Sequence, residues 1–428
     1  MQGSFQVIAA YQMSMCEPDT IQYFLYNFKN SLNVFGDSNH DYMCRDVRAE
    51  WLGLPSDFRG TMGVNPQQKQ LGFTVMYSQD LKRFAEYDFL KRFWLNIAVP
   101  IVVIENNMNL TQWGVQNVAD VCPKDIVSAF NQSCWRFGKI NGRMSRLNVA
   151  PIYIQLGGAF LDDGPNQVVS YSTLLIPSGQ EDEGKYMFEP VAGYNGHLAF
   201  GTGVNFQFGL NRDNERFDVC FYLNLEGVFL IRNWHYRTFD LKCKPWSRYL
   251  LLTRPGAMPG QYEPAVNIFT QRVKVRPYNV VDFAIGFRVK SESFELEAGY
   301  SIWGHGSERI ECLHKFDCNF GIAGPILPGD TKARSACLST ICQQKATPDE
   351  LLPENQNPKF CCVGAADLDV HSAEAPGALN HKAHLAGGFE HKGQRVDAFV
   401  GVGAFYEIPQ KNSALKMWGV WLKLGGSF

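Results

Sequence analysis

The chain has 428 residues, a formal net charge of −2, 19% charged residues and 13% aromatic residues. The charged fraction lies below the roughly 25% usual in soluble domains, and the balanced charge without a basic tract predicts no nucleic-acid partner. No run of about 18 apolar residues occurs, which excludes a transmembrane helix but not a membrane-spanning strand, because such a strand needs only about 9–11 residues.

The N-terminal segment, residues 1–57, has an ambiguous pattern. Segments 5–11 and 21–28 are suited to two more strands, or the region could form a plug. Residues 1–5 lack a basic region followed by an apolar core, so an exported protein would have to be present here in its mature form. The sequence predicts a boundary after residue 57, with a barrel over residues 58–428.

Residues beyond this boundary alternate apolar and polar side chains over long stretches. Segments 195–210, 217–226, 282–290, 293–302 and 394–407 carry apolar, often aromatic residues at every second position, with Gly, Asn and Glu between them. Period-two alternation is typical of a strand, and these stretches exceed the about five or six residues usual in soluble strands. An apolar outer face and a polar inner face predict a transmembrane barrel. A soluble β-rich binding protein is the alternative.

The connections between these stretches alternate in length. Short turns, such as residues 391–394, are predicted on one side of the membrane, and the insertions 108–146, 233–246 and 305–379 on the external side. Counting strands back from the C-terminus predicts an all-β, antiparallel barrel of about 14 strands, with about 12 to 16 accepted. This count includes strands at 58–65, 247–254 and 263–275.

The polar positions of the strands predict a lumen in which acidic residues outnumber basic ones. A hydrated lumen conducts small solutes, and an acidic lining favours cations. The predicted lumen-lining residues are Asp218, Glu226, Asp282, Arg288, Lys290, Glu295, Glu297, Arg395, Asp397 and Glu407.

Twelve cysteines suit an oxidising compartment. Segment 305–379 has little alternation and several prolines, so disulfides are predicted to order it. Cys122 and Cys134 could pin a short helix at both ends, whereas Cys220 on the lumen face is predicted to be a free thiol. The disulfide candidates are Cys122, Cys134, Cys312, Cys318, Cys337, Cys342, Cys361 and Cys362.

No enzymatic activity, metal or cofactor is predicted. His381 and His384 would point to opposite faces of a strand, which argues against a shared metal site, and no Gly-x-Ser-x-Gly elbow occurs. Segment 239–249 mixes aromatic and basic residues and could form part of a membrane rim or a surface loop.

The last eleven residues alternate again and end on an aromatic residue. Trp418, Leu422 and Leu424 share one face and Gly419 lies on the other. This C-terminal strand, ending in Phe428, resembles the closing strand of Gram-negative bacterial outer-membrane β-barrels. The resemblance implies an outer-membrane location, and it implies that Trp418, Gly419, Leu422, Leu424 and Phe428 carry the assembly signal.

The sequence therefore predicts a porin-like channel for passive diffusion of small solutes, a role that is compatible with an abundant structural protein of the envelope. Its expected partners are outer-membrane lipid and lipopolysaccharide, small solutes and further copies of itself, with a trimer favoured. One alternative is a barrel for hydrophobic compounds, because the strand count and a plug look like the long-chain fatty-acid transporter family. The other is a structural lattice protein or adhesin, similar to the cysteine-rich major outer-membrane proteins of chlamydiae.

Overall fold

The computed structural model describes residues 3–15, 30–36, 38, 45–83, 92–116, 123–140, 142–164, 166–210, 217–254, 261–312, 319–323, 333–334, 363–411 and 414–428. Its main feature is a closed barrel of 12 antiparallel strands. The strand order around the barrel is β5-β1-β26-β25-β24-β19-β18-β12-β11-β10-β9-β6, and pairing of β5 with β6 closes the ring. The all-β antiparallel fold class is thus confirmed. The predicted count of about 14 strands is wrong, and the observed 12 are the lower limit of the predicted range.

The barrel strands have 11 to 15 residues, enough to cross a bilayer. Their bounds are β1 Gly3–Ser14, β5 Gln67–Asp80, β6 Phe93–Asn107, β9 Ile152–Asp163, β10 Asn166–Ile176, β11 Ala199–Gly209, β12 Asp218–Leu230, β18 Asn279–Lys290, β19 Phe294–His305, β24 Ala378–His391, β25 Asp397–Pro409 and β26 Met417–Ser427.

One extra strand, β8 (Arg143–Val149), continues β9 along the same edge of β6. The half of β6 that begins at Ile101 pairs with β8, and the half that ends at Ala98 pairs with β9. Pro100 and Pro151 lie where the pairing changes, and neither has a backbone N–H to donate to the ladder. The break therefore has a local cause in the sequence.

The outer face of the barrel is apolar and exposed. Phe287 is 53% exposed and Leu385 is 61% exposed, and comparable side chains occur on every wall. A soluble sandwich would cover such a face, and monomeric soluble proteins rarely expose large contiguous apolar patches. Further exposed outward residues are Phe5, Leu71, Phe73, Val75, Ile101, Val103, Leu156, Phe200, Phe208, Leu225, Val281, Leu296, Val400, Val402, Val420, Leu422 and Leu424.

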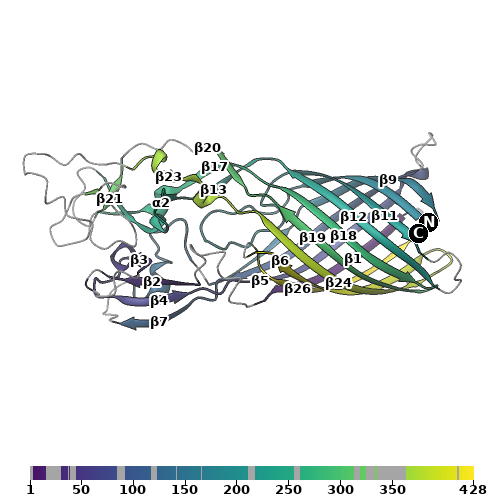
Figure 1. Cartoon of the computed structure of the whole chain (residues 1–428), viewed down its shortest axis with the longest axis horizontal. Coiled ribbons are helices and arrows are strands. Elements are labelled where there is room, and N and C mark those ends of the chain that lie inside the picture. Colours follow the sequence, from purple (N-terminus) through teal and green to yellow (C-terminus); the bar gives the residue numbers. More distant parts are fainter. Residues whose placement is uncertain are drawn as a thin grey trace, which may run out of the picture.

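A second body, which we call the head, is formed by the insertions that follow β1, β6, β10, β12 and β19. It lies at one end of the barrel, and both termini lie at the other (Figure 1). The predicted insertions 108–146, 233–246 and 305–379 all begin at the head end, whereas the short connections 164–165, 291–293 and 392–396 lie at the terminal end.

The head consists of short strands and helical turns. One sheet contains β2 (Ser31–Phe35), β3 (Val47–Arg48), β4 (Arg59–Gly63) and β7 (Thr111–Gln116); another contains β13 (Asn233–Thr238), β17 (Thr270–Arg276) and β20 (Arg309–Cys312). The remaining strands are β14 (Asp240–Leu241), β15 (Leu251–Thr253), β16 (Glu263–Pro264), β21 (Gly321–Ala323), β22 (Ala333–Arg334) and β23 (Leu368–Asp369). The helical elements are α1 (Ile126–Ala129), α2 (Ala265–Phe269), η4 (Ala49–Leu52), η5 (Leu81–Arg83, beside the barrel), η7 (Ser247–Tyr249), η9 (Ala365–Asp367) and η10 (Val370–Ala373).

The head has a hydrophobic core to which all five insertions contribute. Phe58, Phe130, Phe239 and Phe269 are fully buried in it, and Met187 and Phe188 pack against it. Segment 239–249, expected at a rim or in a surface loop, belongs largely to this core, where Arg248 forms an ion pair with buried Asp240 at 2.7 Å. Within the described residues, no helix is long and apolar enough to cross a membrane.

Three predicted barrel strands belong to the head instead. Segments 58–65, 247–254 and 263–275 form β4, β15 and α2 with β17, while residues 3–14, assigned to the ambiguous N-terminal segment, form barrel strand β1. The predicted boundary after residue 57 therefore does not separate the barrel from the rest. The reason is physical: Val273 and Val275 alternate as they would in a barrel, but they face a protein core. Segment 21–28 lies outside the described residues.

Shortening a core side chain of β17 is expected to loosen the head without opening the barrel. Val273 is completely buried, so Val273→Ala should lower the local free energy of opening of the head by about 2 kcal/mol. The measurement is the rate of proteolysis within the head, with gel mobility before and after boiling reporting on the barrel. Val281→Ala, at an exposed site on β18, is the matched control. A loss of the heat-dependent mobility shift in Val273→Ala would contradict the separation of the two bodies.

Candidate functional site: the barrel lumen

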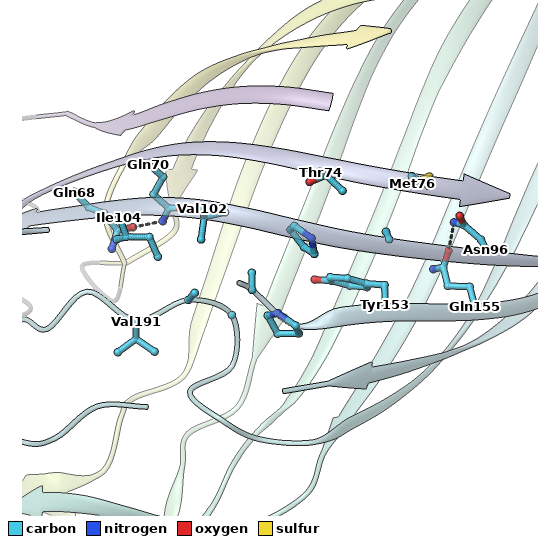
Figure 2. Close-up of a pocket in the computed structure, with 16 residues that line it drawn as sticks. Gln68, Gln70, Thr74, Met76, Asn96, Val102, Ile104, Tyr153, Gln155 and Val191 are labelled. Carbon is cyan, nitrogen blue, oxygen red and sulfur yellow. Dashed lines mark hydrogen bonds between the residues drawn. The ribbon is translucent and has the colours of Figure 1, made fainter. Parts of the chain in front are cut away.

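One half of the lumen wall is lined by neutral polar side chains. They come from β1, β5, β6, β9 and β10 and form two hydrogen-bonded rows. In the first row, Gln12 donates to Gln70 at 2.8 Å, Gln70 to Gln68 at 2.7 Å, and Gln68 to Asn106 at 3.0 Å. The second row is Ser78, Asn96, Gln155 and Thr173, with distances of 3.0 to 3.1 Å. Figure 2 shows Gln70, Asn96 and Gln155 around a shared cavity.

The opposite half of the wall is charged. Glu297 on β19 accepts hydrogen bonds from Arg288 at 2.9 Å and from Tyr222 at 3.0 Å, and it lies 3.1 Å from His384. Arg288 also pairs with Glu295 at 3.1 Å, and Lys290 pairs with Glu390 at 3.2 Å. These charges largely neutralise one another locally. They therefore contribute more to the contacts between strands than to the electrostatic potential in the lumen.

A second set of lumen charges has no opposite partner. Glu226 and Asp282 lie directly opposite each other across β12 and β18, and no ion pair involves either of them within the part of the chain that the structure describes. Glu407 accepts hydrogen bonds from the neutral groups of Trp303 and Asn380, so its charge is not cancelled.

Two lysines are the lumen cations without an ion pair in the part of the chain that the structure describes. The Lys382 ammonium lies 5.4 Å from the centre of the Phe405 ring, and that of Lys423 lies 5.1 Å from Phe399. Neither has a carboxylate within ion-pair distance among the described side chains. Lys423 is among the basic lumen residues expected from the sequence. Alternation along the strands also predicts inward positions for Lys382, Glu390, Tyr222 and His384, so the sequence pattern could have added these four residues to the predicted lining.

The remaining predicted lining residues lie near the terminal end. Asp218 begins β12 opposite Lys290, and Asp397 begins β25 and accepts a hydrogen bond from the backbone N–H of Gly393 at 2.9 Å. Arg395 is exposed in the turn before β25, because the strand begins only at Asp397. The prediction that Arg395 lies on a lumen-facing strand is therefore wrong.

The segment between β10 and β11, residues 177–198, enters the barrel mouth; we call it the lumen segment. Asn106 donates to the carbonyls of Phe188 and Glu189 at 3.4 and 3.0 Å, and Ala192 packs on Ile104 and Ala150. Val191, Ala192 and Gly193 thereby form one wall of a cavity of about 640 Å³, whose other walls are the neutral polar strands (Figure 2). A second cavity of about 430 Å³ lies on the charged side, against Arg288, Trp421 and Lys423.

Gly193 fits this arrangement because it has no side chain. Its backbone has a positive φ of 67°, and an added Cβ would lie 2.2 Å from Pro151 Cδ. The lumen segment therefore packs directly against the proline at the break between β8 and β9.

A buried charge network joins the lumen segment to the head. Asp182 pairs with Arg237 at 2.8 Å, Arg237 pairs with Glu308 at 3.2 Å, and His235 Nδ1 lies 3.4 Å from Asp182. His197 Nδ1 donates to the Ile231 carbonyl at 2.7 Å, and its Nε2 lies 3.1 Å from His235 Nε2. With His197 neutral and its Nδ1 donating to Ile231, its Nε2 can only accept, so the His235 Nε2–H donates to it.

Acidification is expected to release the lumen segment. Burial lowers the pKa of His197 below its usual 6.5, so the state in which the lumen segment is docked prefers neutral His197. This state therefore loses stability as the pH falls from 6.5 toward the lowered pKa of His197. The pKa of Asp182 is also lowered, because contacts with His235 and Arg237 outweigh the burial that raises it. Its contribution is lost only in stronger acid, below the usual carboxylate pKa of about 3.9.

The measurement for this pH effect is hydrogen exchange of residues 177–198. Exchange should be faster at about pH 5.5 than at about pH 8 after correction for intrinsic rates. In His197→Gln the difference between the two pH values should shrink. Equal corrected rates at both pH values in the unmodified protein would show that this network does not control docking.

Cysteine pairing is not seen in the described residues. Cys134 and Cys243 are exposed free thiols, and Cys220 is a free, buried thiol on the lumen face, as predicted for it. The predicted pairing of Cys134 is thus not present; its thiol points outward, 3.7 Å from Gln132. Cys312 lies in β20. Cys122, Cys318, Cys337, Cys342, Cys361 and Cys362 lie outside the described residues, so the stapling of segment 305–379 stays a prediction.

The C-terminal strand closes the barrel against β1. Trp418, Leu422 and Leu424 lie on the outward face with Val420, and Gly419 lies inward beneath Phe405. The backbone of Phe428 exchanges two hydrogen bonds with that of Gly3, at 2.9 and 3.0 Å. His381 and His384 lie on opposite faces of β24: His381 contacts outward Tyr300, and His384 contacts inward Glu297. No cluster of potential metal ligands occurs among the described side chains.

Comparisons with known proteins give structural likenesses without sequence relationship. No family model and no curated protein matches the chain. An outer membrane channel from Pseudomonas putida is similar with 8% identity and a TM-score of 0.42, covering 100% of this chain and 96% of that one. The transport unit of the autotransporter AIDA-I from Escherichia coli has 7% identity and a TM-score of 0.37, with coverage of 100% and 90%.

A FadL homologue from Pseudomonas aeruginosa has 9% identity and a TM-score of 0.31, covering 99% of this chain and 90% of that one. These similar structures are bacterial outer-membrane β-barrels. Their identities and TM-scores are too low to transfer a substrate or a mechanism. The closed barrel follows from the strand pairing of this chain itself.

Proposed function

We propose that this protein is a non-enzymatic, porin-like channel of the bacterial outer membrane, through which small hydrophilic solutes diffuse with a weak preference for cations. One observation carries the proposal: a closed 12-stranded barrel combines an exposed apolar exterior with a polar interior that contains cavities. Water must solvate the polar side chains of the interior, and only lipid accommodates the exterior at low free-energy cost.

The cation preference rests on the charges that remain unpaired. Glu226, Asp282 and Glu407 form no ion pair in the described residues, and Asp218 and Asp397 add negative charge near the terminal end. Among the described lumen side chains, the cations that oppose them without an ion pair of their own are Lys382 and Lys423. Because the dielectric screening in a hydrated pore is strong, the resulting preference is expected to be weak.

The lumen segment limits the size of the solute. It supplies one wall of the larger cavity and is fixed at both the barrel wall and the head. The path is therefore expected to pass between the lumen segment and the strands, and to admit solutes no larger than small metabolites or hydrated ions.

The test is single-channel recording of the purified full chain in planar bilayers, with reversal potentials measured in a salt gradient. Steps of conductance with a small cation-selective reversal potential would support the proposal. Absence of conductance together with a co-purified lipid would favour the predicted alternative, a barrel for hydrophobic compounds. Clear anion selectivity would contradict the cation preference assigned to the acidic residues of the lumen.

The assembly state is part of the same proposal. We expect oligomers, with a trimer favoured, because porin-type barrels often associate through their outer walls. Gel mobility of unboiled and boiled samples in mild detergent, with and without reductant, reports barrel closure, oligomers and disulfide cross-links together. An unboiled band at the position of the monomer would contradict the expected oligomer.

A further inference from the structure

The sheet of β13, β17 and β20 prolongs the barrel wall beyond its apolar band. β13 follows β12, β17 precedes β18 and β20 follows β19, and the order of the three strands repeats that of the barrel strands they extend. Figure 1 shows the three strands beyond the head end of the barrel. Val273 and Val275 are completely buried in the core of the head. The alternate residues of β17 therefore face away from the core of the head, on the same face as Tyr236, whose ring stacks on Phe137 at 5.5 Å.

These outward residues form what we call the basic face: Arg272, Lys274, Arg276, Arg309, Trp234 and Tyr236. Register places Trp234 beside Lys274, Tyr236 beside Arg272, and Arg309 beside Arg276. Arg272, Arg276, Arg309 and Tyr236 are exposed. None of the four cations has a carboxylate within ion-pair distance in the described residues, whereas the neighbouring Arg232 pairs with Glu311 at 3.0 Å.

The basic face begins where the apolar band ends. Ile231 at the end of β12 is 52% exposed and Val281 near the start of β18 is 51% exposed. Arg232 follows Ile231 directly, and Arg276 lies just before β18. In a membrane-spanning barrel this level coincides with the lipid headgroups, where aromatic rings and the aliphatic stems of basic side chains are favourable.

The spacing of the cations indicates the kind of headgroup. Arg272, Lys274 and Arg276 form a row of about 13 Å along one strand, which is longer than one phosphate group can bridge. Arginine binds phosphate with two parallel hydrogen bonds, and neighbouring lysine adds a point charge. A headgroup with two separated phosphates fits the row better than a headgroup with one.

We propose that the basic face binds the phosphorylated sugar headgroup of a bisphosphorylated glycolipid of the lipid A type. This inference rests on the proposed membrane-spanning function, because it places the head-end rim at headgroup level. It adds a defined site, a ligand class and an orientation: the head lies on the side of the membrane whose leaflet contains the glycolipid.

The experiment measures lipid binding to the full chain in detergent micelles by native mass spectrometry. The probes are bisphosphorylated lipid A, its monophosphorylated form and phosphatidylglycerol. The variant Arg272→Gln/Lys274→Gln/Arg276→Gln removes the row, and Lys82→Gln/Arg92→Gln/Lys392→Gln removes three exposed cations at the terminal end as a control for net charge. A third variant, Arg272→Lys/Arg276→Lys, keeps the charge but removes bidentate binding.

The unmodified protein and the control are expected to retain lipid A, and the row variant to bind it about tenfold more weakly. The monophosphorylated probe and the lysine variant should give intermediate affinities. Lipid A binding unchanged in the row variant would overturn the site, and equal affinity for phosphatidylglycerol and lipid A would overturn the glycolipid as its ligand. Heat-dependent gel mobility verifies barrel folding in each variant. If the row variant does not fold, the affinity of the lysine variant for lipid A tests the site instead.

Channel recordings on the same samples separate this inference from the proposed function. Conductance of the row variant should equal that of the unmodified protein, because the basic face is outside the lumen. If the unmodified protein binds lipid A but does not conduct, the glycolipid site is supported and the proposed channel function is contradicted. If it conducts but shows no preference for lipid A, the channel function is supported and the glycolipid site is contradicted.

Discussion

The double variant Glu226→Gln/Asp282→Asn is expected to remove most of the weak cation preference of the channel. The two carboxylates face each other across adjacent strands and form no ion pair among the described residues. Their removal leaves Glu407 to face the lysines Lys382 and Lys423, so the uncompensated charges of the central wall nearly balance. The permeability ratio of cations to anions should change by roughly fivefold at low salt and by less at high salt.

Reversal potentials in potassium chloride gradients measure this effect. The control is Asp57→Asn/Glu263→Gln, which removes two carboxylates from the head and should leave the ratio unchanged. Amide replacements keep the shape of the side chains, so conductance should change much less than selectivity. A reversal potential of the double variant equal to that of the unmodified protein would show that permeating ions do not pass these carboxylates.

The second large effect is expected from Gly193→Val, which should raise the conductance roughly twofold or more by displacing the lumen segment. The new side chain would overlap the rigid ring of Pro151, and its backbone would keep a positive φ that is unfavourable for a β-branched residue. Overpacking costs about 1–3 kcal/mol and the strained backbone a similar amount. The wall that the lumen segment contributes to the 640 Å³ cavity would be lost.

Gly227→Val is the matched control, because a Cβ at Gly227 meets no atom within 4 Å. It should leave conductance and heat-dependent gel mobility unchanged. The Gly193→Val barrel should also remain heat-modifiable, since the strain falls on a connection rather than on a strand. An unchanged conductance would mean that the solute path does not run along the lumen segment.

The barrel could be predicted from the sequence because its strands combine two signals. Segments such as 282–290 are long, and their alternate residues are apolar on one side and polar on the other. The head was not predictable in the same way. Residues 270–276 show the same alternation, but Val273 and Val275 face a protein core, and the alternation itself does not distinguish a core from lipid.

The lumen could be predicted only as far as side-chain direction. Alternation assigned Glu226, Asp282 and Glu297 to one face, but it gave no information on which carboxylates would be neutralised. That depends on neighbours from distant strands: Arg288 and His384 reach Glu297, and no cation reaches Glu226. The lumen segment was likewise missed, because its contacts with Asn106 and Pro151 are made by an irregular connection without periodicity.

The pairing of β1 with β26 sets the order of events in folding. These strands contact each other along nearly their whole length, from Ser4 beside Ser427 to Ser14 beside Met417. Neighbouring hairpins such as β18 and β19 can form locally, but the seam joins residues more than 400 positions apart. Until β26 has been made, the incomplete sheet keeps two open edges with unpaired backbone groups. The barrel can therefore close only once β26 is available, which makes closure a late step.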